Sequence, residues 1–416
     1  MPLAVLENDS AVLGLLAVTL GVIFYTSSLN APFWKKFYTY IPSLLLCYFI
    51  PGIYNSTGLI DGQTSQLYPV ISRYLLPASL VLLTISLDYP GIKRLGPKAL
   101  IMFLVGTAGI MVGGPLVLAV YQNISPASFS ATGEESVWRG MATVAGSWIG
   151  GSANQTAMKE VFNVGDNIFS AMIAMDVICA NIWMGFLLYG ASISQKIDKW
   201  LKADSSAIEE LKHNLSKLKD ENARIPHTGD FIVILAVGLG VTGISHVFAD
   251  IITPYIETNY PYLAQFSLTS KFFWIIVIAT TLGMLLALTP VKNLEKAGAS
   301  RIGTVLLYFL VAAVGMNMDI LAILDNPLLF AVGLTWIAIH VFLMLLVAKL
   351  IRAPLFFVAV GSQANIGGAA SAPIVASAFS PALAPVGVLL AVLGYALGTY
   401  GAYISGLVMQ WIAGGG

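Results

Sequence analysis

The sequence has little charge. Only 10% of its 416 residues are Asp, Glu, Lys or Arg, whereas a soluble domain usually carries about 25%. So few charges cannot cover the surface of a soluble protein of this length. Lys and Arg together equal Asp and Glu in number, so there is no excess of positive charge to attract nucleic acid. The composition therefore argues against a soluble enzyme and against a nucleic-acid partner.

Cysteine, histidine and the common catalytic motifs are also scarce. The two cysteines, Cys47 and Cys179, lie in apolar segments, which indicates buried packing residues rather than disulfides or metal ligands. The four histidines show no ligand spacing, and no HExxH, GxSxG or GxxxxGK[ST] motif occurs. We therefore expect no enzymatic activity, no bound cofactor and no ATP-driven pumping.

Long apolar segments dominate instead. Windows of 18 or more nearly uncharged residues include 12–29, 168–188 and 386–409, and a helix of this length can cross a bilayer. We therefore predict an all-α polytopic protein embedded in a lipid bilayer. The apolar segments fall at 11–29, 37–54, 67–87, 97–121, 137–162, 167–192, 230–248, 271–289, 301–317, 327–350, 354–379 and 385–410.

The segments form two similar halves, 1–192 and 230–416, separated by a charged linker at 193–229. "SRYLLPASLVLLTISLD" in the first half resembles "SRIGTVLLYFLVAAVGMNMD" in the second, since each opens with Ser-Arg and ends with Asp. Weak internal symmetry of this kind is typical of secondary transporters. We therefore predict an internal repeat, although the shared hydropathy of apolar helices is an alternative explanation.

The distribution of Lys and Arg predicts how the segments cross, because these residues concentrate on the cytoplasmic side. If every segment crosses fully, the two halves contradict each other. If 137–162 and 354–379 enter and return on the same side, the halves agree. This gives about ten full spans, two re-entrant segments in inverted repeats, a cytoplasmic linker and both termini outside a cell inner membrane. A broken helix that crosses fully is the alternative. The basic residues left outside are Arg73, Arg139, Lys159 and Lys271.

The two segments predicted to be re-entrant, 137–162 and 354–379, each contain a Gly-Gly pair among Ser, Asn and Gln. Irregular backbone survives within a membrane only where protein or a water-filled cavity covers it. A break frees carbonyls for a cation and directs helix N-termini at an anionic group. Helix packing is the alternative, but it accounts less well for Asn and Gln, whose amides need several partners. The predicted substrate and ion site comprises Ser147, Gly150, Gly151, Ser152, Asn154, Gln155, Thr156, Ser362, Gln363, Asn365, Gly367, Gly368 and Ser371.

One carboxylate lies deep inside an otherwise uncharged segment. Placing a charged side chain at the centre of a membrane helix costs about 2.5 kcal/mol or more, so such residues are usually functional. We predict that Asp176 either ligates Na⁺, a hard cation that suits oxygen ligands, or takes up a proton as the coupling step. A structural hydrogen bond to a neighbouring helix is the alternative.

Other polar residues in apolar segments carry weaker signals. Lys159 and Glu160 are expected to pair near the mouth of the first re-entrant segment. Tyr395 and Thr399 share a helical face, but the glycines around them favour a packing contact. His340 is alone in its segment, which indicates a packing residue rather than a proton relay.

"GSWIGGSANQTAMKEVF" followed by "MIAMDVICANIWM" resembles an integral membrane family catalogued as domain of unknown function 819, over nearly the whole chain. That family is distantly similar to the cation/proton antiporter and anion transporter superfamily, which includes sodium-coupled glutamate, 2-hydroxycarboxylate and bile-acid carriers. The resemblance implies inverted repeats that meet at the substrate, an elevator movement of a core against a scaffold, and a homodimer. The chain lacks the His-Gly that follows Gly-Gly in the glutamate carriers, so substrate identity does not transfer.

We therefore expect a secondary active transporter of a small polar or anionic organic solute, coupled to Na⁺ or H⁺. A cation/proton antiporter is the main alternative, but it would usually carry a second deep acid beside Asp176. A channel or a non-transporting membrane scaffold fits less well, because two unlike broken segments in one chain suit alternating access.

Overall fold

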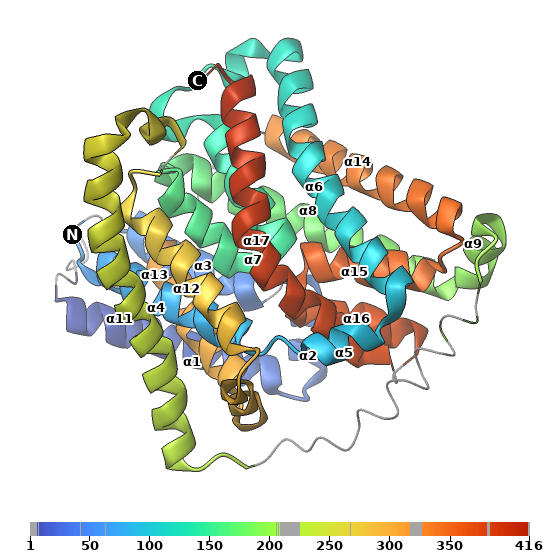
Figure 1. Ribbon diagram of the computed structural model, residues 1–416, viewed down its shortest axis with the longest axis horizontal. Helices are drawn as coiled ribbons and strands as arrows, with labels where there is room; N and C mark the ends of the chain where they lie inside the picture. Colours follow the sequence, from blue (N-terminus) through green and yellow to red (C-terminus); the bar gives the residue numbers. More distant parts are fainter. Residues whose placement is uncertain are drawn as a thin grey trace.

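The computed structural model describes residues 6, 8–41, 43–62, 64–204, 206, 208, 225–266, 268–316, 327–380 and 383–414. These parts of the chain are almost entirely helical (Figure 1). Much of the charged linker lies outside the described residues, so the predictions for it stay predictions.

The helices follow the apolar segments of the sequence closely. In the first half they are α1 (Asp9–Ser28), α2 (Pro32–Tyr40), α3 (Ser43–Ser56), α4 (Leu67–Thr84), α5 (Tyr89–Arg94), α6 (Gly96–Ile124), η1 (Pro126–Phe129), η2 (Gly133–Glu135), α7 (Val137–Val161), α8 (Asp166–Ser192) and α9 (Ser194–Leu201). In the second half they are α11 (Thr228–Asn259), η3 (Pro261–Phe266), α12 (Lys271–Leu286), η4 (Pro290–Ala297), α13 (Ala299–Gly315), α14 (Leu328–Ile351), α15 (Leu355–Ile366), α16 (Gly368–Phe379) and α17 (Ala384–Ile412).

Seven of the described helices are long and apolar enough to cross a membrane, namely α1, α4, α6, α8, α11, α14 and α17. An eighth span results if α12 and η4, which meet at a 94° bend, are taken together. The 17 residues of α13 rise about 26 Å, less than the roughly 30 Å hydrocarbon core. The structure is thus that of a polytopic helical membrane protein, with fewer long spans among the described helices than the ten that the sequence predicts.

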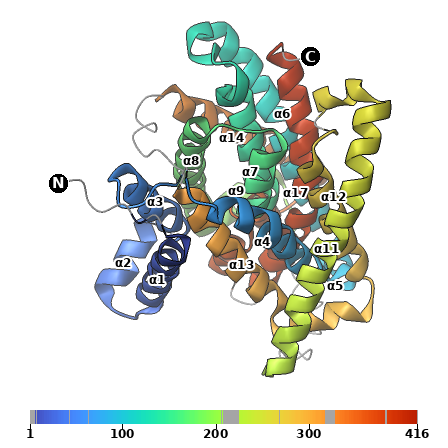
Figure 2. The ribbon, with the colours of Figure 1, turned by 90° about the vertical axis from the view of Figure 1, so that its left-hand side faces the viewer.

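The helices pack as two groups (Figures 1 and 2). The first group contains α1, α3, α4, α11, α12 and α13, and lies mostly to the left in Figure 1. The second contains α6, α7, α8, α14, α15, α16 and α17. The groups touch chiefly where α4 and α12 meet α7 and α17, so contacts within each group far outweigh those between them.

The segment assigned to α7 is a helical hairpin rather than a straight helix. Its backbone leaves helical geometry at Gly150 and Gly151, and Gly151 has φ +74°, which favours glycine. A methyl group added at Gly146 would lie 2.6 Å from the carbonyl oxygen of Asn154. A straight helix would separate these positions by about 12 Å along its axis. The two arms therefore run antiparallel, and we name residues 137–161 hairpin 1.

Helices α15 and α16 form a second hairpin, named hairpin 2. The chain reverses at Gly368, which has φ +60°. Across the arms, Gln363 Nε2 donates to Ser371 Oγ at 2.7 Å, close to the tip. The rings of Phe356 and Phe379 pack with centroids 5.5 Å apart at the open end. Contacts near the tip and at the open end therefore hold the same two antiparallel arms together.

The open end of hairpin 2 is fastened to the start of the linker. The backbone N–H of Leu355 donates to Asp198 Oδ1 at 2.7 Å. Asp204 pairs with Lys98, at the N-terminal end of α6, at 3.1 Å. Hydrogen bonds from Ser206 and Lys98 lower the pKa of Asp204 to about 2, so this carboxylate stays ionised at neutral pH. Hairpin 2 thus opens at the end of the bundle where α6 begins.

Hairpin 1 opens at the other end of α6. The loop 125–136 leads from the end of α6 into hairpin 1, and Gly165, just after the hairpin, donates its N–H to Glu134 of that loop at 2.8 Å. The 29 residues of α6 rise about 43 Å, so the two hairpins enter the bundle from opposite ends. The chain therefore reverses at both Gly-Gly pairs, and neither segment continues straight past its glycines.

Replacing Gly146 with Ala is expected to destabilise the fold by about 1–3 kcal/mol, because the new methyl group would overlap the opposite arm of hairpin 1. The measurement is the thermal unfolding of the detergent-purified protein. Gly185→Ala in α8 is the matched control, since no atom lies within 4 Å of the added carbon there. Equal melting temperatures for the two variants would contradict the antiparallel packing.

Candidate functional site

The two hairpins meet at α17. A methyl group added at Gly394 would lie 2.7 Å from the carbonyl oxygen of Ile149 in hairpin 1 and 3.6 Å from that of Ala364 in hairpin 2. One added at Gly398 would lie 2.6 Å from Gly150 Cα. Glycine at these places lets both hairpins approach one helix backbone closely, as the packing interpretation of this stretch predicts.

Asn154 ties the tip of hairpin 1 to α17. Its Nδ2 donates to the carbonyl oxygens of Gly150, at 2.9 Å, and Tyr395, at 3.0 Å. Its Oδ1 accepts from the hydroxyl of Thr399 at 2.6 Å. The amide is fully buried, and these three bonds satisfy both of its ends. Thr399 therefore donates a hydrogen bond to hairpin 1, in addition to the packing contact that the surrounding glycines predict.

Asn365 makes a parallel arrangement between hairpin 2 and α6. Its Nδ2 donates to the carbonyl oxygens of Phe103, at 3.0 Å, and Gly361, at 2.9 Å. Its Oδ1 accepts from Thr107 Oγ1 at 2.8 Å. Both asparagines thus use their amides to hold a hairpin against a neighbouring helix.

Asp176 of α8 is held by side chains of hairpin 1. Trp148 Nε1 donates to Oδ1 at 2.6 Å, and Gln155 Nε2 donates to Oδ2 at 3.1 Å. Ser147 also faces the carboxylate. Trp148 precedes the hairpin tip and Gln155 follows it, so both arms contact one carboxylate that is only 5% exposed. The structural hydrogen bond considered for Asp176 is therefore present, and it runs to the broken element itself.

The buried polar atoms without a hydrogen-bond partner include one near Asp176 and one near the tip of hairpin 2. Such an atom costs about 1–3 kcal/mol unless something pairs with it. Tyr48 of α3 is 1% exposed, and its unpaired Oη lies near Thr156 and Asp176. Gln363 Oε1, near the tip of hairpin 2, is also buried and unpaired. The first atom comes from one helix group and the second from the other.

His340 is satisfied by its neighbours. Its Nδ1 lies 3.0 Å from the carbonyl oxygen of Gly106, which can only accept, so this nitrogen carries a proton. Ser362 Oγ accepts from Trp183 Nε1 at 2.8 Å and lies 2.8 Å from His340 Nε2. Both ring nitrogens of His340 thus have partners within the protein, which fits the predicted packing role.

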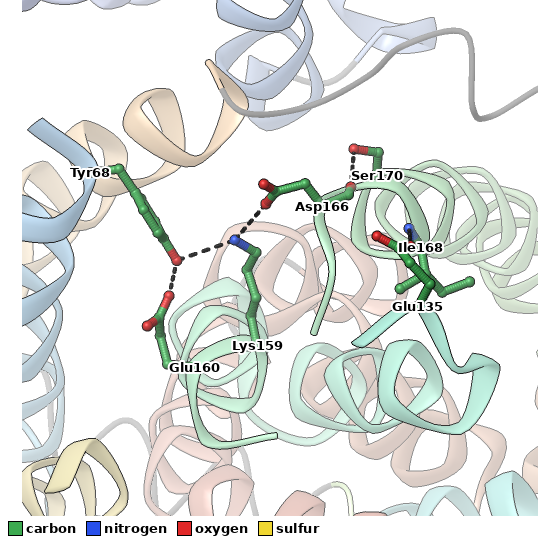
Figure 3. A network of polar contacts seen from close by, with 7 residues as sticks. All are labelled: Tyr68, Glu135, Lys159, Glu160, Asp166, Ile168 and Ser170. Carbon is green, nitrogen blue, oxygen red and sulfur yellow. Dashed lines mark hydrogen bonds and ion pairs between the residues drawn. The ribbon is translucent and has the colours of Figure 1, made fainter. Parts of the chain in front are cut away.

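Lys159 and Glu160 do not pair with each other, contrary to expectation, because neighbouring residues point about 100° apart around a helix. Lys159 pairs with Asp166 at 2.8 Å, and its ammonium lies 4.6 Å from the centre of the Tyr68 ring. The Tyr68 hydroxyl donates to Glu160 (Figure 3). Since Tyr68 belongs to α4, this network joins the two helix groups at the mouth of hairpin 1.

The residues predicted from sequence therefore divide between two places. Ser147, Gln155 and Thr156 gather around Asp176, whereas Ser362, Gln363 and Ser371 belong to hairpin 2. A methyl group added at the tip residue Gly151 would lie 3.4 Å from the Tyr395 ring, and Ser152 beside it is half-buried. Sequence reasoning missed four partners from these clusters, namely Tyr48, Thr107, Trp148 and Trp183.

No group of three or more His, Cys, Asp and Glu side chains capable of holding a metal ion occurs among the described residues. Asp176 thus offers a single carboxylate. A cation there would be completed by neutral oxygens, for which the hydroxyls of Ser147, Thr156 and Tyr48 are the nearby candidates.

Thr399→Val is expected to destabilise the protein by about 1–3 kcal/mol, because it leaves the buried amide oxygen of Asn154 without its donor. Thermal unfolding measures the effect. Thr242→Val is the matched control, since Thr242 is equally buried, at 2% exposure, but donates only to its own helix, at Gly238. A loss no larger than that of the control would show that the Asn154 clamp contributes little.

Comparison with known proteins shows the family to which the chain belongs. It is 24% identical over 368 residues to the "Uncharacterized membrane protein YjcL" of Bacillus subtilis (strain 168), an alignment that covers 84% of this chain and 85% of the relative. The family described as "Protein of unknown function (DUF819)" matches residues 14–412, nearly the whole length. The chain belongs to the DUF819 family of membrane proteins.

Proposed function

We propose that this protein is a secondary active transporter of a small polar or anionic organic solute, coupled to Na⁺ or H⁺. The observation that carries the proposal is the pair of hairpins that enter from opposite ends and meet at Gly394. Paired broken elements of this kind frame substrate and ion sites in many secondary transporters.

The helix packing supports an internal inverted repeat, with 1–192 and 230–416 as its halves. In such a repeat α4 corresponds to α13, α6 to α14, and hairpin 1 to hairpin 2. Helix α4 packs on α13, and α6 packs on α14, as pairs related by a two-fold axis would. Helix α12 packs on α4 as α3 packs on α13, and α11 contacts α4 as α1 contacts α13.

The division into two helix groups supports elevator movement. We assign the group with α1, α4 and α11 as the scaffold, and the group with both hairpins as the moving core. The proposed topology has ten spans and two re-entrant hairpins in an inner membrane, with the linker in the cytoplasm and both termini outside. The hydrogen bonds that join the groups include Tyr68 with Glu160 and Thr281 with Tyr400, and the movement would break them.

Asp176 is the proposed coupling residue. It is buried, and it contacts both arms of hairpin 1 through Trp148 and Gln155. A bound Na⁺ or proton would change the charge that these two N–H donors stabilise, and would thereby bias the position of the hairpin. The helix N-termini that follow Gly151 and Gly368 present positive dipole ends, which suit an anionic group on the solute.

A cation/proton antiporter is the alternative function. Such an exchanger would place a second acid beside the first. The recorded partners of Asp176 are the neutral side chains of Ser147, Trp148 and Gln155, which favours the solute carrier.

The first test is the melting temperature of the purified protein in Na⁺, K⁺ or choline at several pH values. A ligand at 100 times its Kd stabilises the folded state by about 2.7 kcal/mol. We expect stabilisation by Na⁺, or a pH dependence, that is lost in Asp176→Asn. This variant should still fold, because Trp148 can donate to the remaining oxygen and a flipped Gln155 amide can accept from the new one.

Asp250→Asn is the matched control, since this exposed carboxylate of α11 pairs with Lys271 at the surface. It should keep the ion response of the wild type. If wild type and Asp176→Asn respond identically to ions and to pH, Asp176 is not the coupling residue.

A further inference from the structure

A second polar region lies at the mouth of hairpin 1, apart from Asp176. A partly open cavity of about 340 Å³ is lined by the C-terminal ends of α6 and α17, the loop 129–133 and the first turn of hairpin 1. These helix ends lie near the C-terminus in Figure 1. The cavity is lined mainly by polar groups, among them Gln122, Ser130, Thr132, Ser136, Arg139 and Gln410.

Arg139 is the feature that gives this cavity a charge preference. Of the described residues that line it, Arg139 alone is charged. Its Nη1 donates to the carbonyl oxygen of Phe162, on the far side of hairpin 1, and its guanidinium lies 4.8 Å from the centre of the Trp138 ring. Its Nε is buried and has no hydrogen-bond partner. A buried N–H on a cation is a strong donor that lacks an acceptor.

One nearby carboxylate, that of Glu134, interacts electrostatically with Arg139, and both nearby glutamates accept hydrogen bonds from other groups. Glu134 Oε1 accepts from Asn163 Nδ2 at 2.5 Å, and Glu135 Oε2 accepts from the backbone N–H of Ile168 at 2.8 Å. Neither glutamate lines the cavity. The lining therefore carries a net positive charge together with neutral hydroxyls and amides, which is the chemistry of an anion site.

We propose that this cavity binds a small organic anion through Arg139, with a carboxylate on the guanidinium and further polar groups of the ligand on the hydroxyls and amides. The volume exceeds that of a single carboxylate group, so the ligand is an organic molecule rather than a simple ion. Because Arg139 also bridges the arms of hairpin 1, occupancy would stiffen the mouth of that hairpin. The assignment needs neither transport nor ion coupling at Asp176.

The test is calorimetric titration of the full-length protein in detergent with succinate, and with the neutral diamide succinamide as the matched ligand. We expect saturable binding of succinate, no binding of succinamide, and a loss of about tenfold or more in affinity in Arg139→Gln. Arg73→Gln is the matched protein control, since Arg73 is an exposed arginine that does not line the cavity. It should bind succinate like the wild type.

A second variant tests the proposal even if Arg139→Gln fails to fold. Gln122→Leu alters another lining residue, on α6, and leaves the contact between Arg139 and Phe162 intact, so the variant should fold normally and bind succinate more weakly. Equal binding of succinate and succinamide, or unchanged affinity in both cavity variants, would overturn the proposal. If inorganic phosphate binds as tightly as succinate, the claim that the ligand is an organic molecule is wrong. If succinate no longer binds in nanodiscs of anionic lipid, the site belongs to a lipid headgroup.

Discussion

The reversal of the backbone at two Gly-Gly pairs is the constraint on which this structure depends. A chain that turns inside a membrane must cover its unpaired backbone groups with protein. Here the cover comes from α17, whose Gly394 and Gly398 let the tip of hairpin 1 lie against it, and from the buried amides of Asn154 and Asn365. The polar residues around each Gly-Gly pair thus first make the reversal stable, and only those left over can serve a ligand.

The polar residues of the site divide into those whose hydrogen bonds stabilise the fold and those that have bonding capacity left for a ligand. Asn154 and Asn365 each make three hydrogen bonds within the protein, so their amides are committed to the fold. Tyr48 Oη and Gln363 Oε1 are buried and unpaired, and the Asp176 carboxyl lies near the first of them. Tyr48 belongs to the helix group that contains α4 and α13, and its hydroxyl lies near Thr156 of hairpin 1, whereas Gln363 lies at the tip of hairpin 2.

The sequence predicts the helical class, the apolar segments and both reversals, because these follow from hydropathy, charge parity and Gly-Gly. It does not predict partners brought together by tertiary packing. Trp148 lies within a recognised motif, yet nothing local shows that its indole would reach Asp176, and Tyr48 arrives from a distant segment. The predicted pair of Lys159 with Glu160 is wrong, since helix geometry separates adjacent side chains.

The most direct test of the account is the accessibility of the hairpin 1 tip from each side of the membrane. Ser152→Cys, in a background with Cys47 and Cys179 replaced by alanine, would be treated with a membrane-impermeant thiol reagent in right-side-out and inside-out vesicles. The account predicts labelling from both sides, in proportions that shift with Na⁺ or pH. Labelling from one side only, under every ionic condition, would contradict an elevator transporter built on these hairpins.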